Sequence, residues 1–305
     1  MLKRLFSITN IMFAAVLAIS LIPGKRTGSQ DVQIYTAGIV IFTYVVFLVN
    51  SMLCKDKVRK QSMADIAAIV FGFIVFWDVI TAKLDIMENM LFPMPGQIVA
   101  TFIAEIPAFI EGLVSSIKLL SVGYVLALAL AVPLALLIGW RTRLFRAVNP
   151  LTKVLGPIPP IVYIPYAIAL LPNFTSASIF IIFIGAFWPI FINTLNGTFN
   201  VDRKYIDTAK VLNVNENTML FRIILPAIMP SIISGATIGL VLSFILLTAA
   251  EMIGASSGLG WYVKYFSDFA DYPKVVTGII FIGIVVTGIT YFFDKIEKRL
   301  LIWKS

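Results

Sequence analysis

Histidine is absent from this chain of 305 residues, and cysteine occurs once, as Cys54. The absence of histidine excludes histidine-dependent catalytic triads, ordinary zinc catalysis and haem ligation. A single cysteine cannot form a disulfide within the chain, and it indicates no redox role. No segment matches the glycine-rich, lysine-containing loop that binds nucleotide phosphates. The sequence therefore predicts no catalytic residues, no metal site and no cofactor.

Charged residues are also scarce in this sequence. Only 13% of the residues are charged, whereas 59% are hydrophobic, and the mean hydropathy is +0.96. Apolar runs of about 18 to 24 residues are each long enough to cross a hydrocarbon core of about 30 Å. Strict alternation of polar and apolar residues is missing, which argues against a β-barrel. We therefore expect an all-α, polytopic transmembrane helical bundle with about eight spans, at 6–23, 34–53, 63–82, 116–139, 154–171, 178–197, 228–250 and 274–293.

The net charge of +8 reflects an uneven distribution of basic residues. An even number of spans places both termini on one side of the membrane. That side holds 18 of the 24 lysine and arginine residues, so the positive-inside rule makes it cytoplasmic. The basic excess then indicates topology rather than nucleic-acid binding, although Lys25 and Arg26 fall on the external side as exceptions. The cytoplasmic residues are Lys3, Arg4, Lys55, Lys57, Arg59, Lys60, Arg141, Arg143, Arg146, Lys153, Arg203, Lys204, Lys210, Arg222, Lys295, Lys298, Arg299 and Lys304.

The longest polar interruption in the C-terminal two-thirds of the chain runs from Asp202 to Pro230. Apolar residues at helical spacing predict two short amphipathic helices within it. Asp202 and Asn215 are suited to cap the N-termini of these helices, and Asn213 is suited to the left-handed turn that ends the first. A polar helix–turn–helix between two membrane spans is typical of a docking element. The helical spacing is seen at Tyr205, Ile206, Ala209 and Leu212, and again at Leu220, Ile223, Ile224 and Ala227.

This stretch resembles the EAA loop of ABC-importer permeases. Asp207-Thr208-Ala209 is followed by Asn213 and then by Ile224-Leu225-Pro226, where the family has Glu-Ala-Ala, a glycine and an apolar-Leu-Pro. Aspartate keeps the negative charge, and asparagine keeps a residue that adopts the left-handed turn. The resemblance implies that the loop docks on a separate ATPase subunit, with Ala209 small enough to seat its helix in a cleft of that subunit. The implied coupling residues are Tyr205, Asp207, Thr208, Ala209, Leu212 and Asn213.

From Ser115 to the C-terminus, the chain resembles the permeases of sulfonate-, taurine- and nitrate-type importers. The matching segments occur in the family's order, and Leu91–Gly96 resembles the Phe-Pro-Ser-Pro stretch that precedes the core of these permeases. The other segments are Gly139 with Arg141–Arg146, Pro157-Ile158-Pro159-Pro160, Phe187-Trp188-Pro189-Ile190 with Asn193-Thr194, the EAA-like loop, Ala250–Gly260 and the basic tail around Lys298-Arg299.

The resemblance implies a domain organisation and a set of partners. Residues 1–62 would form an extra N-terminal transmembrane hairpin with a basic cytoplasmic loop, and 63–114 the first core span with an external segment. Residues 115–305 would form the permease core, with its cytoplasmic coupling loop at 198–227. The expected assembly is a homodimer of this chain in the bacterial inner membrane, with ABC ATPase subunits that bind the ATP and a periplasmic or lipid-anchored substrate-binding protein. The implied solute is small: a sulfonate, taurine, nitrate or a pyrimidine precursor.

Four prolines interrupt the predicted span at 154–171, namely Pro157, Pro159, Pro160 and Pro165. Interrupted helices in membranes need protein or water to satisfy the freed backbone groups. We therefore expect Pro159 and Pro160 to line the translocation path or a gate. A kink that serves only helix packing is the alternative.

Glu251 ends the seventh predicted span and precedes a loop of small residues that includes Gly254, Ser256 and Ser257. A carboxylate at that depth is costly unless it is hydrated or paired. One interpretation is an interfacial carboxylate paired with Lys264. The other is that the loop re-enters the membrane as part of a gate, and that Glu251 holds it against a neighbouring helix.

Two further functions are compatible with a polytopic protein. A secondary transporter should show interrupted helices in both halves, whereas this chain has one cytoplasmic docking loop. An intramembrane enzyme needs polar catalytic residues inside its spans, and these spans hold no histidine and no carboxylates paired at helical spacing. We therefore expect the permease subunit of an ATP-driven importer, without enzymatic activity of its own.

Overall fold

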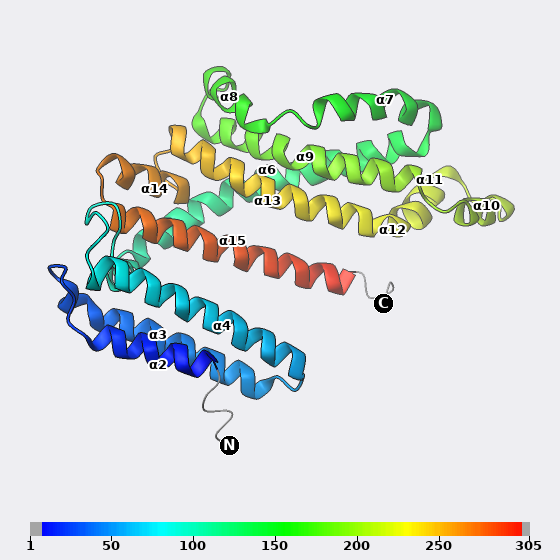
Figure 1. The fold of residues 1–305 in the computed structure, drawn as a ribbon. Coiled ribbons are helices and arrows are strands. Elements are labelled where there is room, and N and C mark those ends of the chain that lie inside the picture. Colours follow the sequence, from blue (N-terminus) through cyan, green and yellow to red (C-terminus); the bar gives the residue numbers. More distant parts are fainter. Residues whose placement is uncertain (1–7, 301–305) are drawn as a thin grey trace. The chain divides into compact units, whose positions relative to one another are not determined.

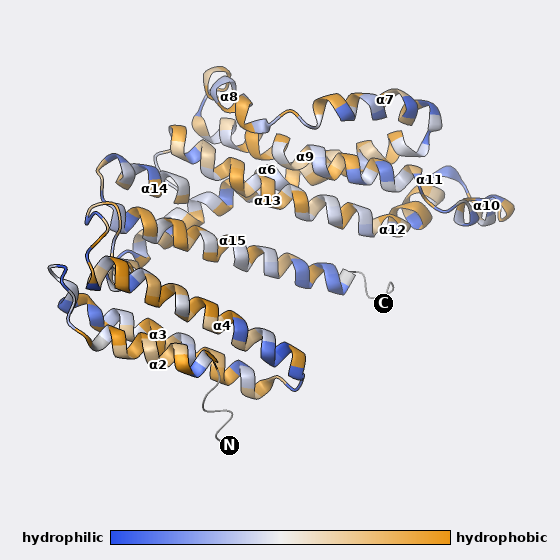
Figure 2. Ribbon diagram, in the orientation of Figure 1, coloured by the Kyte–Doolittle hydropathy of each residue, from blue (hydrophilic) through white to orange (hydrophobic). Residues whose placement is uncertain are grey.

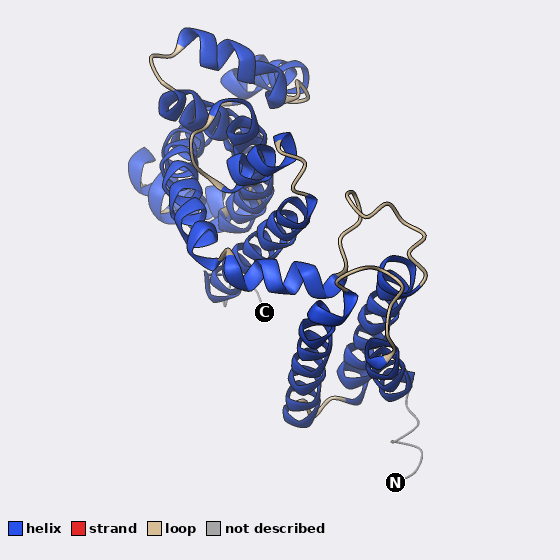
Figure 3. Ribbon diagram, turned by 90° about the vertical axis from the view of Figure 1, so that its left-hand side faces the viewer, coloured by secondary structure: helices blue, strands red, loops and turns tan. Residues whose placement is uncertain are grey.

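The structure is a computed structural model that describes residues 8–300, and all regular elements among them are helices (Figure 3). No strand occurs in this part of the chain, which confirms the predicted all-α bundle. Lys3, Arg4 and Lys304, which the charge argument assigned to the cytoplasmic side, lie outside the described residues.

Six helices are long and apolar enough to cross a membrane. Each coincides with one of the predicted spans, although most extend beyond the predicted bounds. They are α3 (Ser29–Leu53), α4 (Lys57–Asp78) with its π-helical continuation η1 (Val79–Lys83), α6 (Ile106–Trp140), α9 (Phe174–Phe199), α13 (Met229–Gly254) and α15 (Tyr272–Leu300).

The other two predicted spans are not continuous long helices. The segment at 6–23 contains α2 (Ile8–Leu21), whose 14 residues extend about 21 Å, while residues 6 and 7 lie outside the described part of the chain. The segment at 154–171 falls across α7 (Thr142–Leu155), the 3-10 helix η2 (Pro160–Tyr163) and α8 (Ile164–Leu170), with a bend of 79° between the two parts. By length and composition, the described residues hold six candidate spans, or seven if the bent pair is one span, and the predicted span at 6–23 begins before them.

The chain divides into two compact units. Unit 1 comprises residues up to Phe109 together with Val263–Ile280, and unit 2 comprises Ile110–Tyr262 together with the residues from Phe281 onward. The shorter helices belong to loops between the spans. They are α5 (Pro95–Ala104), α10 (Arg203–Val211), α11 (Glu216–Thr218), the π-helical turn η3 (Met219–Ile224), α12 (Leu225–Ala227) and α14 (Leu259–Asp268).

Helices α2, α3 and α4 pack on one another in unit 1 (Figure 1). Val16, Val40 and Phe71 form the centre of this bundle. The ring of Phe13 stacks on that of Tyr44, with 3.8 Å between the ring centroids. Apolar residues at the crossing points of the three helices therefore hold the bundle together.

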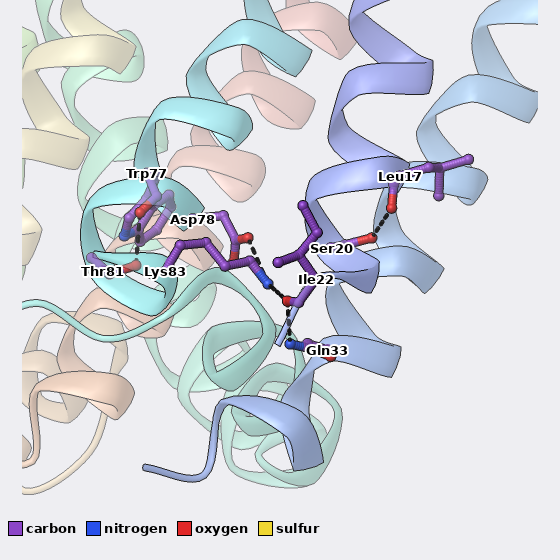
Figure 4. A network of polar contacts seen from close by, with 8 residues as sticks. All are labelled: Leu17, Ser20, Ile22, Gln33, Trp77, Asp78, Thr81 and Lys83. Carbon is purple, nitrogen blue, oxygen red and sulfur yellow. Dashed lines mark hydrogen bonds and ion pairs between the residues drawn. The ribbon is translucent and has the colours of Figure 1, made fainter. Parts of the chain in front are cut away.

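A polar network lies at one end of this bundle (Figure 4). Lys83 of η1 donates a hydrogen bond to the carbonyl oxygen of Ile22 and pairs with Asp78 at 3.8 Å. Gln33 of α3 donates to the same carbonyl oxygen at 3.1 Å. The loop after α2 is therefore tied both to the end of α4 and to α3.

Arg26 in this loop accounts for one exception to the positive-inside rule. The residue is only 5% exposed. Its Nη1 donates to the carbonyl oxygen of Phe92 at 2.7 Å, and its Nε lies 3.4 Å from a carboxylate oxygen of Asp85. Because the charge is paired within unit 1, it does not require a different topology.

Helices α9 and α13 lie side by side at the centre of unit 2 (Figure 1). A methyl group on Gly235 would lie 2.8 Å from the carbonyl oxygen of Pro189, and one on Gly239 would lie 3.1 Å from that of Ala186. These two glycines therefore permit the close approach of α13 to α9. Apolar residues predominate in α9 and α13, whereas hydrophilic residues gather around α10 and α11 and at the end of α15 (Figure 2).

Candidate functional site

The polar interruption folds as a hairpin of α10, α11, η3 and α12, called the 202–227 hairpin below. Asp202 caps α10 by accepting from the backbone N–H of Lys204, and Asn215 caps α11 by accepting from that of Thr218. Asn213 adopts φ of 48°, in the left-handed region. The two predicted caps and the predicted turn residue are therefore confirmed.

The cap of α10 is strengthened by an ion pair outside the spans. The ammonium of Lys204 lies 2.7 Å from a carboxylate oxygen of Asp202. Hydrogen bonds from the side chain and backbone of Lys204 lower the pKa of Asp202 below its ordinary value. The carboxylate therefore stays ionised at neutral pH, and this contribution to the cap is lost only as the pH falls through that lowered pKa.

One face of the hairpin packs into the chain's own core. Ala209 is 2% exposed and lies in a cluster with Leu136 of α6 and with Leu220 and Ile224 of the second arm. Ala209 therefore offers no surface to a partner, which differs from the expectation that it seats α10 in a cleft of an ATPase. Its small side chain instead lets α10 approach the second arm of the hairpin.

Other apolar side chains of the hairpin are exposed in this chain. Tyr205 is 50% exposed and Leu212 70% exposed. Val211 at 83% and Phe221 at 57% add to the same exposed set. The remaining predicted coupling residues, Asp207 and Thr208, are also exposed, and Thr208 donates to the carbonyl oxygen of Lys204 at 2.7 Å. The hairpin thus combines a packed apolar cluster with exposed apolar side chains.

Glu216 ties the hairpin to the end of α6. Its carboxylate accepts a hydrogen bond of 3.1 Å from the indole of Trp140 and lies 3.8 Å from the guanidinium of Arg141. The sequence analysis missed this role. Its only signal is that an acidic residue follows the cap residue Asn215 while Trp140 and Arg141 directly follow the predicted span at 116–139.

A second cluster surrounds Glu251 near the end of α13. The carboxylate is 1% exposed, accepts from the hydroxyl of Ser116 at 2.6 Å and accepts from the backbone N–H of Gly260 at 2.7 Å. The Ser116 hydroxyl in turn accepts from the N–H of Leu259 at 3.0 Å. Glu251 therefore holds the following loop against α6, as one of the two interpretations predicted.

The other interpretation pairs Glu251 with Lys264, but the ion pair that Lys264 forms in the structure is a different one. Lys264 pairs with Asp268, four residues along its own helix. Among the described residues, no lysine or arginine forms an ion pair with Glu251. Ser116 was missed by the sequence analysis, because nothing local relates it to a carboxylate 135 positions later.

Gly258 closes the loop over the carboxylate. It adopts φ of +127°, and a methyl group there would lie 2.4 Å from the Cδ atom of Glu251. Both the backbone conformation and the space therefore require glycine at this position.

The remaining predicted gate residues take different positions. Ser257 shares a hydrogen bond of 2.9 Å with Ser115, whereas Ser256 is exposed. Gly254 is exposed at the end of α13, where a methyl group would lie 3.1 Å from the ring of Phe174. Pro159 and Pro160 lie at the start of η2, in the break between α7 and α8. The 251–258 residues thus form one site, and the two prolines belong to a separate segment.

An open cavity of about 430 Å³ adjoins the hairpin. It lies between α10, the end of α9 and the start of α13. Among the described residues, no group of three or more histidine, cysteine, aspartate or glutamate side chains is arranged to hold a metal ion. The lining residues of the cavity are Asn193, Asn196, Gly197, Asn200, Val201, Asp202, Tyr205, Ala227, Ile228 and Ser231.

Comparisons with known proteins agree with this arrangement. Residues 123–302 match the family described as "Binding-protein-dependent transport system inner membrane component". The chain is 30% identical over 255 residues to a putative ABC transporter permease protein of Methanocaldococcus jannaschii, covering 82% of this chain and 94% of that protein.

Two other relatives carry more specific names. The chain is 30% identical over 234 residues to the putative aliphatic sulfonates transport permease protein SsuC of Bacillus subtilis, covering 76% of this chain and 84% of that protein. It is 33% identical over 171 residues to the nitrate import permease protein NrtB of Leptolyngbya laminosa, covering 56% of this chain and 61% of that protein.

Among solved structures, the fold is similar to that of a chain of the MetNI methionine ABC transporter in an inward facing conformation. The TM-score is 0.55 at 18% sequence identity, and the match covers 65% of this chain and 98% of that chain.

Proposed function

Because this chain belongs to the family of binding-protein-dependent transport system inner membrane components, we propose that two copies of it form the translocation path of an importer and that each 202–227 hairpin docks on an ATPase subunit. The chain is the permease subunit of an ABC importer. ATP hydrolysis and solute capture therefore belong to separate partners, an ATPase and a substrate-binding protein.

The observation that carries the docking proposal is the exposure of large apolar side chains on the hairpin. Val211, Leu212 and Phe221 are each more than half exposed, on a segment otherwise rich in charged and amide side chains. Apolar side chains grouped on a polar surface favour a protein partner. The acidic Asp207 and basic Lys210 beside them supply a charged rim, as at protein–protein interfaces.

Helix α13 supports a direct route from this surface to the Glu251 loop. It begins shortly after α12 and runs for 26 residues without a break to Gly254, a length of about 39 Å. Glu251 near its far end holds the loop at 254–260 against α6. A displacement of the hairpin therefore moves one rigid helix that also carries the loop, and this is the coupling that we propose.

A single substitution tests the docking proposal. Leu212→Asp places a charge among the exposed apolar side chains and leaves the buried cluster around Ala209 unchanged, so the permease should remain in the membrane and lose most of its ATPase on co-purification. Val58→Asp is the matched control, since Val58 is 74% exposed on the predicted cytoplasmic loop at 55–62. Equal ATPase recovery with Leu212→Asp and Val58→Asp would remove the hairpin from the interface.

The orientation in this proposal places the hairpin, the 55–62 loop and both termini in the cytoplasm, with 83–113 and 251–273 outside. It requires the segment at 6–23 and the bent pair of α7 and α8 each to cross the membrane. It is supported by the 18 of 24 basic residues on the cytoplasmic side and by the pairing of Arg26 with Asp85 on the other. The positive-inside rule then needs no exception for Arg26.

We further propose that the solute is a small oxyanion such as nitrate or an alkanesulfonate. The support is the naming of two relatives after these solutes, at 33% and 30% identity. The chain itself has no cluster of acidic residues that would favour a metal cation among its described residues.

A further inference from the structure

The cavity beside the hairpin brings together polar side chains from three helices. Asn193, Asn196 and Asn200 lie at spacings of three and four on α9 and therefore share one face of that helix. Ser231 of α13 and Tyr205 of α10 complete the polar part of the lining. A ligand in this cavity would contact both the spans and the hairpin.

Much of the hydrogen-bonding capacity of this lining is unused. The amide of Asn193 donates to the carbonyl oxygen of Pro189 at 2.8 Å. In the described part of the chain, the side chains of Asn196, Asn200 and Ser231 form no hydrogen bond with another protein group. Two amides and a hydroxyl are thus available to a polar ligand or to water.

Among the lining side chains that the structure describes, the charge is close to balanced. Asp202 is the one charged residue of this set, and the ammonium of Lys204 lies 2.7 Å from its carboxylate. Neutral N–H and O–H donors without an unpaired cation hold an oxyanion more weakly than charged partners do. A site from which a solute must leave needs this weak binding.

Two other cavities of similar size in the described residues have mainly apolar linings. The groove of about 360 Å³ on α13 and α15 is lined by residues such as Val241, Ile245 and Ile282. The groove of about 350 Å³ in unit 1 is lined mainly by aromatic and aliphatic side chains such as Phe73 and Leu91. Neither lining offers the donors that an oxyanion requires.

We propose that the cavity lined by Asn196, Asn200 and Ser231 is an inner solute site, which holds a small oxyanion weakly before its release. Tyr205 forms part of its wall, so the same helix that docks on the ATPase also shapes this site. The volume of about 430 Å³ is in the range of roughly 300–1,000 Å³ that small-molecule sites occupy. The inference rests on the proposed function, because it assigns this site to the same solute path.

The test uses the complete transporter, with its ATPase, in proteoliposomes that contain ATP. Binding protein added outside selects the copies whose hairpins face the lumen. Nitrate and methanesulfonate serve as probes, and the initial uptake rate is measured while the luminal concentration of the same anion is raised. A solute that occupies the inner site from the lumen should slow uptake.

The variants change this inhibition in opposite directions. Asn196→Leu with Asn200→Leu removes two hydrogen bonds of about 1 kcal/mol each and should raise the inhibitory luminal concentration about thirtyfold. Asp202→Asn keeps an equally good cap but removes the negative charge, so the inhibitory concentration should fall. Asn50→Leu, an exposed asparagine on α3, is the matched control and should leave it unchanged.

Two results would overturn the inference while the proposed function stands. In the first, the transporter takes up a probe but luminal anion does not slow the uptake. In the second, luminal anion inhibits the wild type and the double variant equally. If the double variant does not reach the membrane, Asn196→Ala alone should raise the inhibitory concentration about fivefold. An unchanged inhibitory concentration in Asn196→Ala would also contradict the inference. If the wild-type transporter takes up neither anion, the proposed solute class is contradicted, and so is the inference that rests on it.

Discussion

At the scale of single residues, the carboxylate of Glu251 has defined partners. One oxygen accepts from Ser116 and the other from the backbone of Gly260, and the residue is 1% exposed. Removal of the carboxylate leaves both donors buried without an acceptor, and a buried unpaired donor costs about 1–3 kcal/mol. The substitutions at this position therefore separate hydrogen bonding from charge.

Glu251→Gln keeps one acceptor and the shape of the side chain, so most transport should remain. Glu251→Ala removes both acceptors and leaves a cavity, and it should lower the free energy of unfolding by about 2–5 kcal/mol and uncouple ATP hydrolysis from uptake. Thermal unfolding of the solubilised protein, with uptake and ATPase assays, measures both effects. If Glu251→Gln abolishes uptake with normal assembly and ATPase stimulation, the charge itself is required, and the structural role assigned here is wrong.

At the scale of elements, the 202–227 hairpin depends on its turn as well as on its core. Asn213 combines φ of 48° with a backbone N–H that donates to the carbonyl oxygen of Lys210 at 3.0 Å. Proline can satisfy neither requirement, whereas glycine satisfies both. The turn therefore sets the angle between the two arms.

Asn213→Pro should block uptake and ATPase stimulation while the protein remains in the membrane, and Asn213→Gly should retain both. Uptake and ATPase assays on membranes with equal amounts of each variant measure the difference. Similar activity of the two variants would show that the turn conformation has no part in coupling.

Ala209→Trp should also block uptake, here because it overpacks the core with Leu220 and Ile224.

The outline of this hairpin follows from its sequence. Short polar side chains that cap helices and an asparagine at the turn are local signals, so Asp202, Asn213 and Asn215 could be assigned from the chain alone. The burial of Ala209 could not, because helical spacing identifies a face but not what covers it. The covering residues include Leu136, which lies on a different span.

The loop after α13 likewise combines features that the sequence predicts with contacts that form only in the folded chain. Its small residues and the buried acid indicated a loop held against a helix, but Ser116 is a partner only in the folded chain. The break near Pro159 was visible as a run of prolines, whereas the bend of 79° depends on packing. The inner cavity joins residues of three helices, and no local pattern marks it.

At the scale of the whole molecule, the account requires one orientation in the membrane. Asn217 is exposed on the hairpin, so Asn217→Cys in a Cys54→Ser background should react with an impermeant thiol reagent only after the membrane is opened. Ser256→Cys, in the exposed loop after α13, is the counterpart that should react from outside. Labelling of Asn217→Cys from the outside alone would reverse the topology and remove the hairpin from the cytoplasm.

The central claim is that this chain is a permease driven by a separate ATPase through its hairpin. The most direct test is uptake of labelled nitrate or methanesulfonate into proteoliposomes that hold the purified complex. Uptake should require luminal ATP and external binding protein, and Leu212→Asp should reduce it at least tenfold, to about the level without ATP, since docking is lost. Uptake that continues without ATP and follows an imposed ion gradient instead would contradict the account and identify a secondary transporter.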